Sequence, residues 1–95
     1  MTMALSSFIE LLECVERGSL SCTEARFQFE NSQLSDFPGS KVISSQLNHY
    51  WHDEDIRQRD LDYRMMQDRE LSKLIKKLNQ GDYRGAAAIT FLHVS

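Results

Sequence analysis

The segment "ELSKLIKKLNQGDYRGAAAITF", residues 70–91, has the pattern of two helices joined at a glycine. The apolar residues of its first half that recur at the spacing of one helix side are Leu71, Ile75 and Leu78. Gly81 interrupts this pattern, and glycine suits the left-handed conformation that ends many helices because it has no Cβ atom. Asp82 can cap the helix that follows. The segment therefore predicts an all-α protein that ends in a C-terminal helical hairpin.

The turn of this hairpin, "LNQGDYRGAA", resembles the turn of tetratricopeptide-type helix pairs, in which a glycine, an acidic or amide residue, an aromatic residue and an alanine allow two helices to pack closely. It is also similar to the last helix pair of phage lysozymes. Both resemblances imply a tight hairpin. A repeat of about 34 residues, which a tandem array needs, does not recur in the chain. No catalytic residue is inferred from the lysozyme resemblance, because the rest of the chain lacks the paired carboxylates of such an enzyme.

Two more helices are predicted before the middle of the chain. The first has an apolar side made of Leu5, Phe8, Ile9, Leu12 and Val15. Gly18 suits its C-terminal end, and Ser21 and Glu24 have the spacing of a capping box, so a second helix is expected to begin at Cys22. Within residues 22–30, however, apolar and polar residues alternate as they do in a strand. Helix and strand both remain open for this segment.

The middle of the chain is predicted to hold a loop and two further helices. Residues 31–40 form the loop, and its last four residues, "FPGS", match a type II turn because proline and glycine supply the two central conformations. Residues 40–52 have the apolar spacing of a helix that Ser40 could cap. Residues 53–79 are predicted as one long helix, with acids at its start and bases at its end, as the helix dipole favours. Whether these two helices are continuous remains open. The prediction is a single domain, residues 1–95, folded as a small bundle of four to five helices.

Composition places this domain among ordinary globular proteins. Of the 95 residues, 41% are hydrophobic and 26% are charged, and the net charge is −3. A pI near 5.5 disfavours a protein that coats nucleic acid or an anionic membrane through bulk charge. No apolar run is long enough to cross a bilayer, and no basic residue precedes Arg17 as it would in a secretory signal. The expected location is the cytoplasm, where Cys14 and Cys22 would remain thiols.

The segment "HYWHDED", residues 49–55, contains residue types that suggest a metal site. His49 can share one helix side with His52 or Asp53, and imidazole and carboxylate groups bind zinc in such an arrangement. The dipeptide His52-Asp53 resembles the metal signature of HD-type phosphohydrolases, but only His93 remains to supply the further histidines of that family. Surface histidines and helix-capping acids explain the segment more simply. No metal, cofactor or catalytic residue is predicted, and a metal-dependent or hydrolytic enzyme is the third functional interpretation.

DNA binding is the second interpretation. The segment "SSQLNHY" resembles the recognition helix of a helix-turn-helix protein, anchored by Ile43 and Leu47. The polar side chains that it would present to base edges are Ser44, Ser45, Gln46, Asn48 and His49. Phosphate contacts supply much of the affinity of such proteins, yet Lys41 is the only base beside this helix and three acids follow it. A compensating basic stripe would have to come from Arg57, Arg59, Arg64, Lys73, Lys76, Lys77 and Arg84. A helix-turn-helix transcriptional regulator is therefore the alternative function.

The predicted long helix carries more apolar surface than one packing side needs. One side holds Leu61, Met65, Leu71, Ile75 and Leu78. The apolar residues that spread beyond it are Ile56, Tyr63, Met66 and Leu74. The first side can serve the core, and the second is left either to the first two helices of the chain or to a partner.

Protein binding is accordingly the first interpretation. Aromatic and methionine side chains make adaptable protein contacts where they are exposed. The predicted partner-binding residues are Tyr50, Trp51, Ile56, Tyr63, Met66 and Leu74. The sequence favours a small, non-enzymatic, cytoplasmic adaptor, chaperone or inhibitor that binds another protein, or a second copy of itself in an oligomer, through its long helix.

Overall fold

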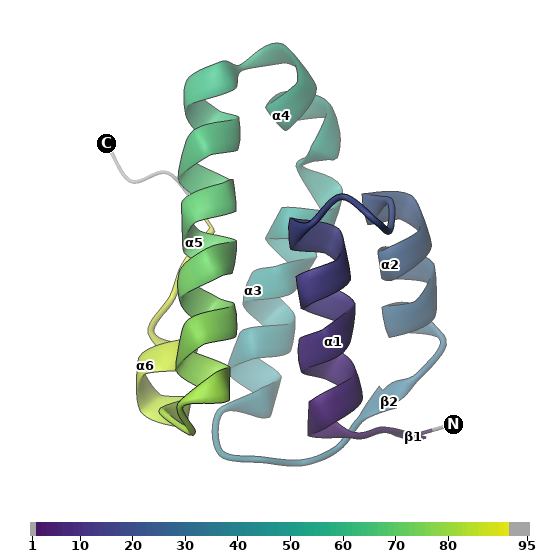
Figure 1. Ribbon diagram of the computed structural model, residues 1–95, viewed down its shortest axis with the longest axis vertical. Helices are drawn as coiled ribbons and strands as arrows, with labels where there is room; N and C mark the ends of the chain where they lie inside the picture. The colour runs from purple at the N-terminus through teal and green to yellow at the C-terminus, as the bar shows by residue number, and fades with distance from the viewer. Residues whose placement is uncertain (1, 92–95) are drawn as a thin grey trace.

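The computed structural model describes residues 2–91, and the all-α prediction is confirmed over this range (Figure 1). The helices are α1 (Leu5–Glu16), α2 (Cys22–Glu30), α3 (Ser40–His52), α4 (Glu54–Arg59), α5 (Leu61–Asn79) and α6 (Tyr83–Ala87). Two strands, β1 (Thr2–Met3) and β2 (Gln33–Leu34), pair in parallel. In Figure 1, α1 and α5 lie side by side in front of α3, α2 packs against α1, and α6 closes the foot of the bundle.

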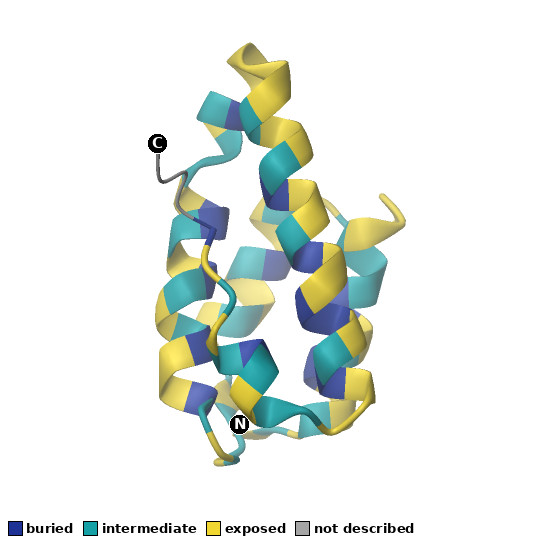
Figure 2. Cartoon of the chain, turned by 90° about the vertical axis from the view of Figure 1, so that its left-hand side faces the viewer, coloured by how far each residue is buried: buried dark blue, intermediate teal, exposed yellow. Residues whose placement is uncertain are grey.

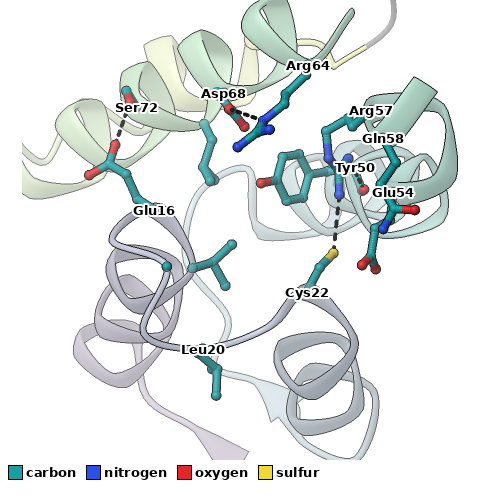
Figure 3. A pocket seen from close by; sticks show the side chains of 13 residues that line it. Glu16, Leu20, Cys22, Tyr50, Glu54, Arg57, Gln58, Arg64, Asp68 and Ser72 are labelled. Carbon is teal, nitrogen blue, oxygen red and sulfur yellow. Dashed lines mark hydrogen bonds and ion pairs between the residues drawn. The ribbon is translucent and has the colours of Figure 1, made fainter. Parts of the chain in front are cut away.

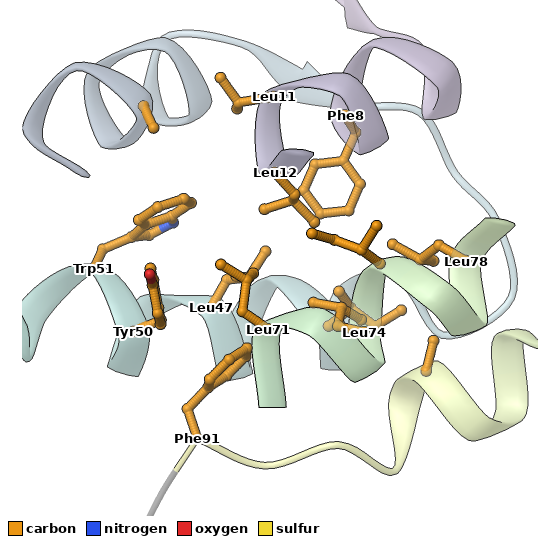
Figure 4. Packing of buried hydrophobic residues seen from close by; sticks show 14 residues of the cluster. Phe8, Leu11, Leu12, Leu47, Tyr50, Trp51, Leu71, Leu74, Leu78 and Phe91 are labelled. Carbon is orange, nitrogen blue, oxygen red and sulfur yellow. The ribbon is translucent and has the colours of Figure 1, made fainter. Parts of the chain in front are cut away.

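The core lies where α1, α3 and α5 face one another (Figure 4). Each helix contributes residues three or four positions apart, which is why only one side of each is apolar and buried. The largest fully buried hydrophobic side chains are Trp51, Phe8, Phe91, Leu12, Ile43, Leu47, Leu71 and Leu74. Phe91, beyond the last helix, packs its ring 5.3 Å from the ring of Tyr50 and so ties the end of the described chain to the core.

The predicted helix ends at Gly81 and Asp82 are confirmed. Gly81 has φ = +72°, and its N–H donates to the carbonyl of Leu78, while the N–H of Asp82 donates to the carbonyl of Lys77. These are the two hydrogen bonds of a Schellman motif, which satisfy carbonyl groups that the end of α5 would otherwise leave unpaired. The carboxylate of Asp82 then accepts from the backbone N–H of Gly85 at 2.9 Å and begins α6.

The two interpretations of residues 22–30 are resolved in favour of a helix. The hydroxyl of Ser21 accepts from the backbone N–H of Glu24 at 3.1 Å, so the cap that the spacing predicted is present. The helix buries only Ala25 fully, which explains why its apolar spacing was ambiguous. Phe27 remains 64% exposed.

The predicted type II turn is confirmed, but the predicted cap at Ser40 is wrong. The N–H of Ser40 donates to the carbonyl of Phe37 at 2.9 Å, and Gly39 has φ = +85°, as the turn requires. A Cβ atom at Gly39 would also lie only 3.0 Å from that of Ala87, because the turn packs directly on α6. Gly39 is therefore the residue before α3, and the hydroxyl of Ser40 instead donates to the carboxylate of Asp36.

The loop predicted over residues 31–40 contains one short element that was not foreseen. Strand β2 pairs with β1, and the N–H of Ser35 extends the ladder to the carbonyl of Met3 at 2.9 Å. Each strand has two residues, too few to show an alternating pattern in the sequence. The pairing fastens the described start of the chain to the loop that precedes α3.

The prediction of one long helix over residues 53–79 is wrong. Asp60 has extended backbone angles and separates α4 from α5, and Asp53 separates α3 from α4. The carboxylate of Asp60 accepts from the backbone N–H of Tyr63 at 3.1 Å and thus caps α5. Aspartate competes with helix propagation in this way because its short side chain can bind backbone N–H groups. The chain consequently reverses at Asp60, and α4 packs against α5 at the upper end of Figure 1.

Among the helices described, none combines the length and the apolar character needed to cross a membrane.

Candidate functional site

A cleft of about 430 Å³ opens between the loop that follows α1, the start of α4 and the middle of α5 (Figure 3). Its wall includes hydrophobic side chains from α1, the loop and α5 and the ring of Tyr50 from α3. The charged side chains that line it are Glu16, Glu54, Arg57, Arg64 and Asp68. These elements are distant in sequence, so the cleft depends on the fold and on the chain reversal at Asp60.

Arg57 is the buried cation of the cleft, with only 8% of its surface exposed. Its guanidinium carbon lies 3.9 Å from the centre of the Tyr50 ring, a cation–π contact. The guanidinium donates to the backbone carbonyl of Tyr50 and to Oε1 of Gln67, each at 2.5 Å, and to the sulfur of Cys22 at 3.3 Å. An arginine has five N–H donors, so three hydrogen bonds leave two donors unused.

Gln67 joins Arg57 to a second, partly buried charged group, the carboxylate of Asp53. Its side-chain amide, fully buried, donates to the carboxylate of Asp53 at 3.0 Å and to the carbonyl of Phe91 at 2.9 Å. The hydroxyl of Tyr63 donates to the same carboxylate oxygen at 2.6 Å. The positive charge of Arg57 and the negative charge of Asp53 are thus bridged by one neutral amide. Within residues 2–91, no carboxylate lies within ion-pair distance of Arg57.

The other charges of the cleft have partners or lie at its edge. Arg64 and Asp68 form an ion pair at 3.6 Å, and the hydroxyl of Ser72 donates to the carboxylate of Glu16. Glu54 lies beside the thiol of Cys22, on the same helix and the same side of the cleft as Arg57 (Figure 3). Of the three cleft acids, Glu54 is therefore the one that shares the Cys22 thiol with Arg57 as a neighbour.

The thiol of Cys22 is not an activated nucleophile. Burial raises its pKa, the positive charge of Arg57 opposes that increase, and the negative charge of Glu54 adds to it. Because the thiolate is the reactive form, a raised pKa leaves the group protonated and unreactive near neutral pH. Both Cys14 and Cys22 are free thiols, as expected.

Two tyrosines hold their protons more tightly in the folded protein than in an unfolded chain. Burial raises the pKa of Tyr50 to about 12, although the neighbouring Arg57 cation partly offsets this effect. Burial also raises the pKa of Tyr63 to about 12, and its hydrogen bond to Asp53 and the negative charge of that carboxylate add to the shift. Both phenols are therefore neutral in the fold up to strongly alkaline pH.

These tyrosines predict a loss of stability at alkaline pH. Below pH 10.0, the ordinary tyrosine value, the phenols are protonated in both states; as the pH rises towards about 12, the unfolded chain releases these protons first. Urea unfolding should show a midpoint that falls progressively over this window. In the double variant Tyr50→Phe, Tyr63→Phe, the fall should be much smaller. An equal fall in the double variant would show that other groups cause it.

Three of the six predicted partner-binding residues cannot reach a partner in this fold. Tyr50, Trp51 and Leu74 are 4%, 2% and 1% exposed and belong to the core (Figure 4). They are covered because α1 and α2 close over them: the ring of Trp51, for example, packs 6.1 Å from that of Phe29. The alternative that the first two helices cover the second apolar side of the predicted long helix therefore holds for Leu74.

The other three predicted residues, Ile56, Tyr63 and Met66, are partly exposed. The hydroxyl of Tyr63 is engaged with Asp53, as described above, so this side chain has a structural role. Ile56 and Met66 lie near the corner between α4 and α5 and remain predictions as contact residues. Ile56 belongs to α4 and the other two to α5, so the three do not lie on the single long helix that the sequence predicted.

The apolar spacing of α5 predicts that Leu61 and Met65 lie on the core side, but these two are its most exposed hydrophobic residues. Leu61 and Met65 are 67% and 52% exposed. They continue the periodicity of Leu71 and Ile75, but the corner at the start of α5 extends beyond the covering helices, and its surface is mostly exposed in Figure 2. Spacing alone shows which side of a helix is apolar; it does not show where the neighbouring helices end.

Positive charge continues along the exposed side of α5. Met65, Arg69, Ser72 and Lys76 follow one another at helical spacing, and all four are exposed. Within the part of the chain that the structure describes, neither Arg69 nor Lys76 forms an ion pair. Arg57, proposed for a basic stripe, is instead buried in the cleft.

The histidine-rich segment does not form a metal site in residues 2–91, where no group of three or more histidine, cysteine, aspartate or glutamate side chains could hold a metal ion. The ring nitrogens of His52 instead contact the carbonyl of Asn48 at 2.7 Å and the guanidinium of Arg26 at 3.0 Å. His93 lies outside the described residues. Asp53, the third candidate ligand, is committed to the network with Tyr63 and Gln67.

No protein-family model matches the chain, and it has no significant similarity to any curated protein or solved structure. Its function must therefore be inferred from its own surfaces.

Proposed function

We propose that this chain is a small, non-enzymatic protein-binding adaptor or regulator whose α5 receives an amphipathic, acidic segment of another protein. The observation that carries this proposal is the exposed side of α5, where Leu61 and Met65 are followed by Arg69 and Lys76. We refer to these four residues as the α5 face.

The apolar end of the α5 face supports a contact with another protein. Leu61 and Met65 are one helical turn apart, so their side chains are adjacent. Single exposed apolar residues are common on protein surfaces, whereas an adjacent pair of large ones at a projecting corner offers a site for an apolar anchor of a partner. Methionine also adapts to differently shaped partners because its side chain is flexible and polarisable.

The charge of the α5 face decides the kind of partner. The whole chain is acidic, with a net charge of −3, but Arg69 and Lys76 are exposed and without ion-pair partners in the described residues. An acidic segment that places an apolar residue on Leu61 and Met65 and carboxylates beside these bases would complement the surface in both respects. A second copy of this chain that docked in parallel alignment would place its Arg69 and Lys76 against the same two bases. The repulsion between these like charges makes that arrangement unfavourable.

The test is a charge introduced at the apolar pair. We expect the double variant Leu61→Asp, Met65→Asp to reduce capture of the partner from a lysate of the native host by about tenfold or more, because a buried apolar anchor typically contributes more than 1 kcal/mol to binding. The captured protein is identified by mass spectrometry, its contact segment is located by cross-linking, and the affinity of that segment as a peptide is then measured directly. Amide replacement of its acidic residues should weaken binding, as should added salt.

The matched control is Val42→Asp, which places the same charge at an apolar residue of α3 that is 47% exposed. This variant should capture the partner as the unaltered protein does. Equal circular dichroism of all variants shows that they are folded. Undiminished capture by the Leu61→Asp, Met65→Asp protein would contradict the proposal. Concentration-dependent dimerisation that this variant abolishes would instead identify the occupant as a second copy.

The alternative, a helix-turn-helix DNA-binding regulator, gains no specific support from the geometry. Ile43 and Leu47 are buried, as the anchors of a recognition helix would be, but residues 31–39 separate α2 from α3. The helices of a helix-turn-helix are joined by about three or four residues. A titration with duplex DNA at low and high salt tests this alternative directly.

A further inference from the structure

We infer that the cleft beside α5 is a receptor site for a carboxylate group, which the acidic partner segment carries. The inference rests on the proposed function for the source of the carboxylate. The site itself rests on the geometry of Arg57, and a probe that does not involve the partner can test it.

Arg57 supplies the binding chemistry. Its guanidinium is almost fully buried, uses three of its N–H donors within the protein, and lines the cleft with two donors to spare. Buried charges in proteins are normally paired, yet among the described residues Arg57 forms no ion pair, and it is linked to the carboxylate of Asp53 only through Gln67. A carboxylate is the acceptor that matches a guanidinium best, since both groups are planar and can form two parallel hydrogen bonds.

The cleft is placed where the proposed partner segment passes. Leu61, Met65, Asp68 and Ser72 follow one another at helical spacing along α5, and the last two line the cleft. Leu71, buried on the core side, forms part of the same wall. A segment that covers the apolar pair can therefore insert one acidic side chain into the cleft without changing direction.

The acids already in the cleft decide how strongly it binds an anion. Asp68 is neutralised by Arg64, and Glu16 accepts a hydrogen bond from Ser72. Glu54 has a side-chain hydrogen bond with the Cys22 thiol but no ion pair among the described residues, and Figure 3 shows its carboxylate on the same side of the cleft as Arg57. Glu54 should therefore repel an incoming carboxylate, and removing its charge should strengthen binding.

The experiment follows the side-chain Nε–H signals of arginine by NMR in the full, ¹⁵N-labelled protein. The probes are a blocked peptide with one glutamate between apolar residues, the same peptide with glutamine, and succinate. We expect the glutamate peptide to shift the Arg57 signal in a saturable way and the glutamine peptide to leave it unchanged. Equal effects of the two peptides, or no effect of either, would overturn the inference. Binding of succinate without binding of the glutamate peptide would overturn the assignment to a partner segment.

Two substitutions at the edge of the cleft sharpen the test without removing the buried arginine. Glu54→Gln should tighten binding of the glutamate peptide, and Arg64→Gln should weaken it, each by roughly two- to fivefold, the range expected for solvated charge pairs. The matched control is Arg59→Gln, which removes an exposed charge of α4 that is paired with Asp55 and does not line the cleft. An affinity that Glu54→Gln leaves unchanged would also contradict the site.

The failure of this inference can be distinguished from failure of the proposed function. If the Leu61→Asp, Met65→Asp variant loses its partner but neither carboxylate probe binds to the unaltered protein, the partner uses the α5 face alone. The inference of a carboxylate site is then wrong. If the glutamate peptide binds while the Leu61→Asp, Met65→Asp variant retains its partner, the cleft is a carboxylate site. The α5 face is then not the surface that contacts the partner.

Discussion

Replacing Gln67 with leucine should destabilise the protein by about 3–5 kcal/mol, the range for breaking a buried, charged hydrogen-bond network on one side only. Leucine fits the volume, but it removes the acceptor that Arg57 uses and the donors to Asp53 and to the carbonyl of Phe91. A buried group that loses its partner bears the full cost of its desolvation. The free energy of unfolding in urea, measured near neutral pH, gives the effect.

The matched control is Gln28→Leu, the same substitution at an exposed position of α2. It should change the free energy of unfolding by no more than about 0.5 kcal/mol, as is usual for surface residues. A loss of less than about 1 kcal/mol in Gln67→Leu would show that the network contributes little and that the burial of Arg57 depends on its contact with Tyr50 instead.

Trp51→Ala should be the second large effect, a loss of about 3–5 kcal/mol, as for other buried aromatic residues. The side chain is 2% exposed and lies among α1, α2 and α3, in contact with the rings of Phe29 and Tyr50. No other helix can move into the space that it leaves without breaking contacts of its own. The loss is again measured by urea unfolding.

Trp51→Phe should be much milder than this, with a cost below about 1.5 kcal/mol. The indole N–H of Trp51 is buried, and among the described residues it has no hydrogen-bond acceptor. Phenylalanine loses some packing volume but also removes this unsatisfied donor, so the two effects oppose each other. If Trp51→Phe were as damaging as Trp51→Ala, the N–H would have to be satisfied in the folded protein.

The helix ends were predictable because their physics is local. Ser21, Gly39, Gly81 and Asp82 each act on backbone groups within a few residues, so the residue type and its spacing specify the outcome. The break at Asp60 is equally local, but Asp60 lies within a charged stretch whose apolar residues continue on both sides. Nothing in that spacing distinguishes a helix-capping aspartate from one on the surface of an unbroken helix.

The burial of individual side chains was less predictable, because it depends on contacts between distant segments. Tyr50 and Trp51 have the composition of a contact surface and become core residues only because α1 and α2 lie over them. Leu61 has the spacing of a core residue and becomes exposed because no helix reaches it. Periodicity specifies which side of a helix is apolar. How much of that side other helices cover depends on the tertiary structure.

The cleft had no signal in the sequence. Arg57 is one charged residue among many in its segment, and its partners Gln67 and Cys22 lie 10 and 35 positions away. The types of these three residues are unremarkable at the surface of a helical protein. Arg57 becomes a buried cation only because the fold brings Gln67 and Cys22 to its guanidinium.

The network around Gln67 also constrains how α4 and α5 are aligned. Apolar side chains pack almost equally well after a small translation, because dispersion forces have little directional preference. A guanidinium and an amide do not tolerate such a translation, since their N–H groups must meet specific oxygen atoms. If α4 slid by one turn along α5, the guanidinium of Arg57 would lose its acceptor on Gln67 while still buried. These few polar atoms therefore add a directional constraint to the alignment of α4 and α5, beyond that of the single connecting residue Asp60 and the hydrophobic contacts.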